Sequence, residues 1–224
     1  METYVHPKFP QVKICGLTKT EDALKCVSLG ADAIGLVFFK RSPRYINREK
    51  AKTICDALPE AFPKVGVFVD EPFNSLMETA FKCRLNAIQL HGNEPPKLVR
   101  DLIDQGLNVI KALYIESRPS VSQVASYNAS AYLVECAQGE MPGGNAMTWN
   151  WEDAAEFGRR HPMMLAGGLS CENVASAIEK AMPDMVDVSS GVENAPGKKD
   201  MYKVQEFIKA VRGCAPKREL RRIF

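Results

Sequence analysis

Hydrophobic and polar residues follow two alternating patterns along this chain. Short apolar runs, typical of buried strands, are each followed by a segment whose apolar residues recur at helical spacing. The predicted strands are Gln11–Thr18, Ala31–Phe39, Val65–Val69, Ala87–Leu90, Val109–Leu113, Tyr132–Glu135, Met163–Ala166 and Met185–Val188. The predicted helices begin at or near Thr18, Asn47, Asn74, Pro95, Ser120, Trp151, Asn173 and Lys199. The chain therefore contains eight strand–helix units in succession.

Regular alternation of strands and helices predicts a parallel sheet with right-handed crossovers, either an open doubly wound sheet or a closed eight-stranded barrel. A doubly wound nucleotide-binding sheet usually carries its glycine-rich phosphate turn after the first strand. Here the glycines follow the seventh and eighth strands, where such barrels commonly hold phosphate. We therefore predict an α/β protein: a single (β/α)8 barrel domain over residues 1–224, with short extensions at 1–10 and 214–224.

The composition is that of an ordinary globular chain of 224 residues, with 46% hydrophobic and 25% charged residues. No apolar run approaches the roughly 20 residues of a membrane helix, and Met1–Pro10 lacks the apolar core of a signal peptide. We expect a cytoplasmic protein that binds no membrane. The net charge of +2 is too small to indicate a nucleic-acid partner. The basic cluster between Lys217 and Arg222 is expected to be a solvated or frayed tail.

The seven cysteines are scattered singly, with no CxxC pair and no neighbouring His at metal-ligand spacing. This pattern indicates reduced thiols and argues against both a disulfide framework and a zinc site. We expect no metal site. The sequence leaves open whether the protein is a monomer or a homodimer.

Polar residues stand where the predicted strands end, which in a barrel of this kind is the end that carries the active site. They are Cys15, Arg44, Asp70, His91, Glu135 and Asp187. Lys13 and Cys15 are two residues apart and share a strand face, so the ammonium is expected to favour the thiolate. Gln89 and His91 share a face for the same reason. Several of these residues have a structural alternative: Cys15 as a small buried hydrophobe, Asp70 and Asp187 as loop caps, and His91 as a donor to a backbone carbonyl.

Two small-residue loops, Ala166–Ser170 and Ser189–Val192, follow adjacent strands. Such turns expose backbone N–H groups, and a helix N-terminus adds a potential that favours anions. We therefore expect Gly167, Gly168, Ser190 and Gly191 to bind a phosphate, although tight turns needed only for packing are the alternative. Gly143-Gly144 is a weaker signal, either a flexible lid or a third phosphate loop.

Seven sequence blocks, in order, resemble the phosphoribosylanthranilate isomerase family of tryptophan biosynthesis. They are Lys13–Thr18, Gly30–Phe38, Ser42–Tyr45, Val65–Val69, Gln89–Gly92, Ala166–Leu169 and Val186–Glu193. The resemblance spans roughly Val12 to Val211 and implies a (β/α)8 barrel that performs a cofactor-independent Amadori rearrangement. The phosphorylated small-molecule substrate, N-(5-phosphoribosyl)anthranilate, becomes 1-(2-carboxyphenylamino)-1-deoxyribulose 5-phosphate. The enzyme class that the resemblance implies is an aldose–ketose isomerase, an intramolecular oxidoreductase.

The resemblance also implies roles for site residues. Cys15 is the base, Glu135 the acid, and Arg44 the donor that holds the anthranilate carboxylate, a task suited to a planar fork. His91 and Asp187 support the site, and the loops at Gly167-Gly168 and Ser190-Gly191 hold the phosphate.

The chain departs from the family at the acid, which is usually an aspartate, and in the loop Gly143–Ala146. Glutamate keeps the carboxyl group but adds one methylene of reach, and a misplacement near 1 Å can cost on the order of 100-fold in rate. One alternative function is therefore a phosphate-binding barrel of the same family with impaired catalysis or altered specificity. A second alternative is an isomerase of a related phosphoribosyl aminoaldose. The histidine-pathway substrate is disfavoured because no second glycine loop follows the third or fourth strand.

Overall fold

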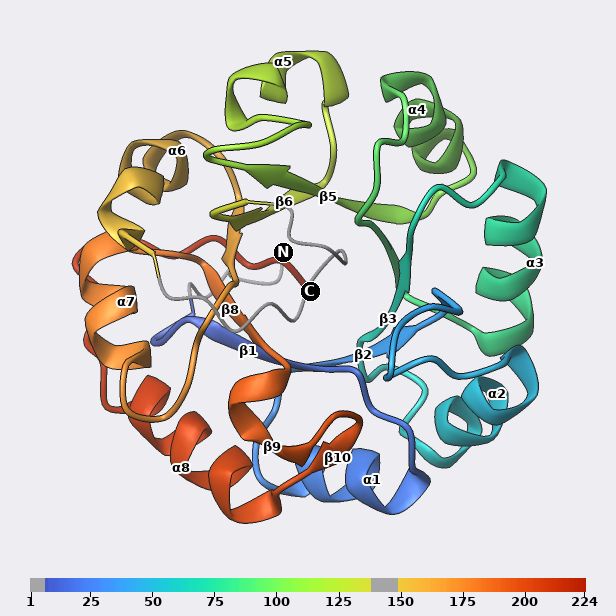
Figure 1. The fold of residues 1–224 in the computed structure, drawn as a ribbon, viewed down its shortest axis with the longest axis horizontal. Coiled ribbons are helices and arrows are strands. Elements are labelled where there is room, and N and C mark those ends of the chain that lie inside the picture. The colour runs from blue at the N-terminus through green and yellow to red at the C-terminus, as the bar shows by residue number, and fades with distance from the viewer. Residues whose placement is uncertain (1–6, 138–148) are drawn as a thin grey trace, which may run out of the picture.

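The computed structural model describes residues 7–137 and 149–224. Within them, eight parallel strands close a barrel in sequence order, and helices surround it (Figure 1). The barrel strands are β1 (Gln11–Cys15), β2 (Ala33–Val37), β3 (Lys64–Phe68), β4 (Ala87–Leu90), β5 (Asn108–Tyr114), β6 (Ala131–Glu135), β7 (Met163–Leu165) and β8 (Met185–Val188). The helices are α1 (Thr20–Ser28), α2 (Arg48–Ala57), α3 (Phe73–Cys83), α4 (Pro96–Asp104), α5 (Val124–Tyr127), α6 (Ala155–Arg160), α7 (Val174–Ala181) and α8 (Met201–Arg212). The predicted (β/α)8 barrel is confirmed.

The barrel strands are apolar because both of their faces are buried. One core fills the barrel interior with small and branched side chains such as Ala33, Val65 and Leu133. The second core lies between the strands and the helices and includes Leu36 and Phe207, both fully buried. Removing these apolar surfaces from water is the main force that closes the barrel.

The pairing of β1 with both β2 and β8 closes the barrel and sets the neighbours of the site residues. Cys15 lies opposite Gly35 in the β1–β2 register, and Lys13 lies opposite Asp187 in the β1–β8 register. The shared face predicted for Lys13 and Cys15 therefore points into the barrel together with Asp187.

In the described residues, the connections also contain three short 3-10 helices and one hairpin. The 3-10 helices are η1 (Val121–Gln123), η2 (Trp151–Ala154) and η3 (Ser190–Val192). The hairpin pairs β9 (Glu193–Ala195) with β10 (Lys198–Lys199) between β8 and α8. The hydrophobic pattern did not predict this hairpin because its strands are short and mostly charged.

Two predicted helix starts differ from the structure. Thr18 does not cap α1; its hydroxyl donates to the Gly197 carbonyl, and Lys19 is the N-cap residue. Asn74 lies inside the first turn of α3, because Pro72 is the N-cap residue there. Asn47, in contrast, caps α2 by accepting a hydrogen bond from the Lys50 N–H.

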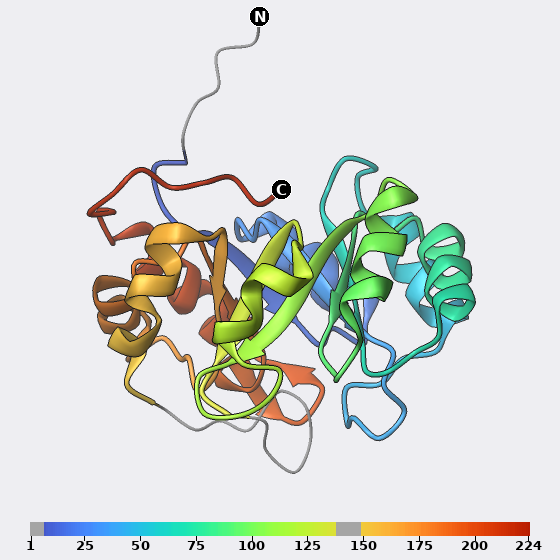
Figure 2. The ribbon, with the colours of Figure 1, turned by 90° about the horizontal axis from the view of Figure 1, so that it is seen from above.

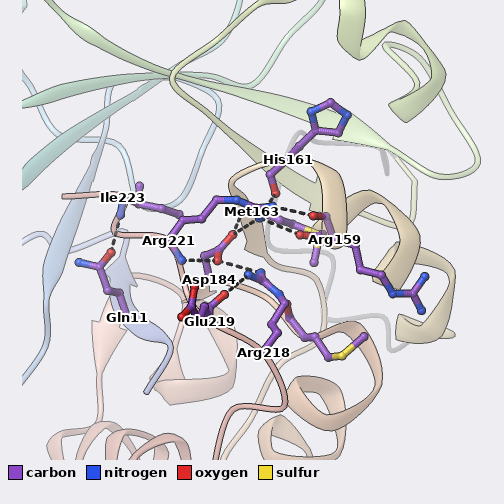
Figure 3. Close-up of polar contacts among 11 residues, drawn as sticks. Gln11, Arg159, His161, Met163, Asp184, Arg218, Glu219, Arg221 and Ile223 are labelled. Atoms are coloured by element: carbon purple, nitrogen blue, oxygen red, sulfur yellow. Dashed lines mark hydrogen bonds and ion pairs between the residues drawn. The ribbon is translucent and has the colours of Figure 1, made fainter. Parts of the chain in front are cut away.

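The expectation of a solvated or frayed C-terminal tail is wrong. The segment after α8 runs across one end of the barrel, and the β9–β10 hairpin lies at the other end (Figure 2). Arg218 and Arg221 converge on the fully buried carboxylate of Asp184 (Figure 3). Ile223 and Phe224 pack against the core of the barrel interior. The tail therefore closes the amino-terminal end of the barrel.

Among residues 7–137 and 149–224, no helix has the length and apolar character needed to cross a bilayer. The same residues contain no group of three His, Cys, Asp or Glu side chains placed to hold a metal ion. The seven cysteines are free thiols.

Candidate active site

A pocket opens at the carboxyl-terminal ends of the barrel strands and encloses about 710 Å³, its open mouth included. The predicted site residues that line it are Cys15, Arg44, His91, Glu135, Gly167, Gly168, Asp187 and Ser190. Of the predicted set, Gly191 is not among the lining residues. The apolar wall of the pocket includes Val37, Phe39 and Val67, which pack around Cys15.

Cys15 ends β1 and is buried with an exposed fraction of 7%. Lys13, fully buried on the same face, donates to Asp187 across a Nζ–Oδ1 distance of 2.9 Å. Burial raises the pKa of the Cys15 thiol; Lys13 opposes this shift, but the net direction is upward. The lysine thus acts in the predicted direction without overcoming burial. Burial also disfavours the charged form of Lys13, but Asp187 and Cys15 outweigh it and raise the pKa of Lys13.

The glycine of β2 opposite Cys15 makes room for the thiol. A Cβ at Gly35 would lie 2.7 Å from the Cys15 sulfur and 3.1 Å from Cε of Lys13. Any side chain at this position would displace the Cys15 thiol and the Lys13 ammonium, so both groups require glycine there.

Glu135 is the last residue of β6, a strand that lies across the barrel from β1 (Figure 1). Its Oε2 lies 3.5 Å from Nε2 of His91, close enough for an ion pair if the imidazole is protonated. Gln89 contacts the other ring nitrogen of His91, Nδ1, at 2.9 Å, which confirms that the two residues share a face. Within the described part of the chain, His91 Nε2 has no hydrogen-bond partner although it is buried. The Glu135 carboxyl and the His91 imidazole are therefore available to a ligand in the pocket.

Arg44 reaches the pocket from the loop after β2, and a carboxylate that the sequence analysis did not single out holds it there. Nε and Nη2 of Arg44 donate to the two oxygens of Glu193 at 2.9 and 2.7 Å. Lys199 also donates to Glu193, at 2.6 Å. Burial opposes ionisation of Glu193, but these two cations outweigh it and lower the pKa of the Glu193 carboxyl. Two cations around one carboxylate leave a net positive charge at this rim.

The two glycine loops meet at the pocket. Gly167 and Gly168 have φ values of 88° and 65°, a backbone conformation that favours glycine. A Cβ at Gly191 would lie 1.9 Å from the carbonyl oxygen of Leu169, so the loop after β8 packs directly against the loop after β7. The close approach requires glycine and holds both loops against one side of the pocket. The weaker candidates Gly143 and Gly144 lie outside the described residues.

A buried network that sequence analysis missed fixes the strand end that carries His91. Lys111 donates to the carbonyls of Leu90 and Gly92, at 3.3 and 2.8 Å, and to Glu94 at 2.9 Å. The Glu94 carboxylate in turn accepts the backbone N–H of Gly92. A lysine inside the apolar run Val109–Leu113 was the available signal, because a buried lysine needs such partners.

Asp70 belongs to this network rather than to the pocket lining. It accepts the backbone N–H of Asn93 at 2.7 Å, and its own N–H donates to Glu94 at 3.1 Å. The structural alternative considered for Asp70, a loop cap, is the role its contacts support.

The fold and the pocket define a (β/α)8-barrel protein with a thiol and a carboxyl group facing one polar cavity beside two glycine loops. A sequence model described as N-(5'phosphoribosyl)anthranilate (PRA) isomerase matches residues 12–210. The chain belongs to this family. An N-(5'-phosphoribosyl)anthranilate isomerase of Desulfatibacillum aliphaticivorans is 50% identical over 198 residues, which cover 88% of this chain and 91% of the relative.

Solved structures agree with the family assignment. The phosphoribosyl anthranilate isomerase of Thermotoga maritima has a TM-score of 0.84 and 41% identity, with 91% of this chain and 99% of that chain covered. A phosphoribosyl anthranilate isomerase in complex with reduced 1-(o-carboxyphenylamino)-1-deoxyribulose 5-phosphate has a TM-score of 0.81 and 40% identity, with the same shares covered.

Proposed function

We propose that this chain catalyses the Amadori rearrangement of N-(5'-phosphoribosyl)anthranilate in tryptophan biosynthesis, with Cys15 as base and Glu135 as acid. The single observation that carries the proposal is that these two residues line one pocket at the carboxyl-terminal mouth of the barrel. Family membership supplies the reaction, and the pocket supplies groups that suit it.

The reaction needs one proton donor and one proton acceptor. Glu135 protonates the furanose ring oxygen, so the ring opens to a protonated imine. The imine makes the hydrogen on sugar C2 acidic, and the Cys15 thiolate removes it. The resulting enaminol tautomerises to the 1-amino-1-deoxyketose. Lys13 favours the thiolate, while Asp187 holds Lys13 in place.

The remaining groups bind the two anionic ends of the substrate. Arg44 donates to the anthranilate carboxylate, and the backbone of Gly167, Gly168, Ser190 and Gly191 binds the phosphate. His91 lies next to Glu135 and contributes its buried Nε2, which has no hydrogen-bond partner among the described residues. The apolar wall around Cys15 suits the aromatic ring.

The proposal extends to the setting of the protein. We propose one domain acting in the cytoplasm on a small phosphorylated substrate, as a monomer or a homodimer. A ligand complex of a similar protein supports the phosphorylated substrate, and a Thermotoga maritima relative described as dimeric supports the homodimer.

Two experiments test the function. A plasmid carrying this chain should restore growth without tryptophan to an auxotroph that lacks this step. Purified protein should consume phosphoribosylanthranilate, and the loss of anthranilate fluorescence measures this conversion. If the protein binds the reduced product analogue tightly but converts no substrate, it is instead a phosphate-binding barrel without catalysis. The presence of both an acid and a base in the pocket favours the enzyme.

A further inference from the structure

The β9–β10 hairpin brings two charged residues, Glu193 and Lys199, to the rim of the pocket beside Arg44. Arg44 and Glu193 are 149 residues apart in the sequence, yet both oxygens of Glu193 accept from the guanidinium. Glu193 is buried, with an exposed fraction of 8%. The contact is therefore a built feature of the site rather than a surface ion pair.

The geometry fixes the orientation of the Arg44 fork. Because Nε and Nη2 face Glu193, the Nη1 group lies on the edge of the planar guanidinium that is left for other acceptors. Arg44 itself lines the pocket. Its stem packs on Gly16, where a Cβ would lie 2.4 Å from Arg44 Cδ. Gly16 thus holds the aliphatic part of Arg44, and Glu193 holds one edge of its guanidinium.

Lys199 gives the cluster of Arg44, Glu193 and Lys199 a net positive charge. Its ammonium donates to Glu193 at 2.6 Å and to the Ser189 carbonyl at 3.0 Å. Without Lys199, the charges of Arg44 and Glu193 would cancel; with it, the cluster carries one net positive charge. The lysine also ties the hairpin to the loop after β8.

We propose that the β9–β10 hairpin is a specificity element, in which Glu193 is a positioning residue that pre-orients Arg44 toward an aromatic carboxylate in the pocket. This inference rests on the proposed function. Pre-orientation removes the cost of ordering a long side chain during binding, so its loss should weaken recognition of the carboxylate in particular. Groups that act on the ribose or the phosphate should be unaffected.

The test compares two substrates in several variants. N-(5'-phosphoribosyl)anthranilate carries the carboxylate, and N-(5'-phosphoribosyl)aniline is the same molecule without it. In Glu193→Gln and Glu193→Asp we expect KM for the anthranilate substrate to rise about 5- to 10-fold, with little change in kcat. KM for the aniline substrate should stay within about twofold of the wild type. Glu193→Asp keeps the charge but shortens the side chain, so it also guards against a folding defect in Glu193→Gln.

Glu179→Gln serves as the matched control, because Glu179 forms an exposed ion pair with Lys217 away from the pocket. It should leave both substrates unchanged. Equal losses on both substrates, or no loss on either, would overturn the inference. If the wild type converts neither substrate, the proposed function is wrong. Titration with the reduced product analogue and its counterpart lacking the carboxyl group then tests Glu193 by the same comparison.

Discussion

Replacing Arg221 by alanine should destabilise the protein without slowing the enzyme. The Arg221 guanidinium donates to the carbonyls of Gly158, His161 and Arg159, at 2.9, 3.0 and 2.6 Å, and to Asp184 at 3.2 Å (Figure 3). It therefore connects the C-terminal tail to the segment before β7 and to the residue that precedes β8.

The magnitude follows from the partners that remain. Hydrogen bonds to charged groups contribute about 1.5–3 kcal/mol each, but Arg221 is 35% exposed and water replaces part of this. Asp184 keeps its contacts with Arg218 and with the Met163 N–H, so it is not left unpaired. We expect a loss of about 2–3 kcal/mol, which for a domain of this size lowers Tm by roughly 5–10 °C.

Thermal unfolding followed by circular dichroism measures this shift. Lys217→Ala is the control, because its exposed pair with Glu179 should contribute about 0–1 kcal/mol. The kcat/KM of Arg221→Ala at 25 °C should equal that of the wild type. The tail crosses the amino-terminal end of the barrel (Figure 2), whereas the pocket residues stand at the carboxyl-terminal ends of the strands. A Tm of Arg221→Ala equal to that of the control would refute this prediction. A loss of activity in Arg221→Ala at an unchanged Tm would refute it as well.

Three further predictions concern the pocket. Lys13→Met should move the pH profile of Cys15 alkylation upward, because it removes the cation that opposes the burial-induced rise of the Cys15 pKa; an unmoved profile would assign the lysine another role. Gly191→Ala should weaken inhibition by inorganic phosphate at least about 10-fold, since its Cβ would collide with the Leu169 carbonyl; unchanged inhibition would place the phosphate elsewhere. Glu135→Asp should lower kcat about 10- to 100-fold if the pocket is shaped for the longer side chain; a faster variant would mean that Glu135 limits the rate.

The strands could be predicted because a barrel buries them on both faces. Val65–Val69 and Ala87–Leu90, for example, are apolar runs bounded by polar turns, and β3 and β4 fall within two residues of them. The polar residues at strand ends were informative for the same reason. A charged side chain that ends an apolar run, such as Glu135, has few structural reasons to be there. A thiol such as Cys15 could also be a small buried hydrophobe, so it became informative only together with the other polar residues at strand ends.

The missed features depend on contacts between distant parts of the chain. In the sequence, Glu193 stood out only as the last residue of the block Val186–Glu193 that resembles the family. The residues around it do not show that Arg44 binds it. The tail was misjudged because its arginines look like a solvated basic cluster, whereas they bind Asp184 and backbone carbonyls. Helix starts failed where a residue of a capping type is not the N-cap residue. The helix α3, for example, begins after Pro72, which makes no side-chain cap bond, and already includes Asn74.

The central claim is that Cys15 and Glu135 transfer protons in one pocket. Its most direct test is the turnover of phosphoribosylanthranilate by the wild type, Cys15→Ala and Glu135→Gln, measured by fluorescence at saturating substrate. We predict conversion by the wild type and a loss of about 10²- to 10⁴-fold in kcat in each variant, with binding of the reduced product analogue retained. A wild-type rate in either variant would contradict the account.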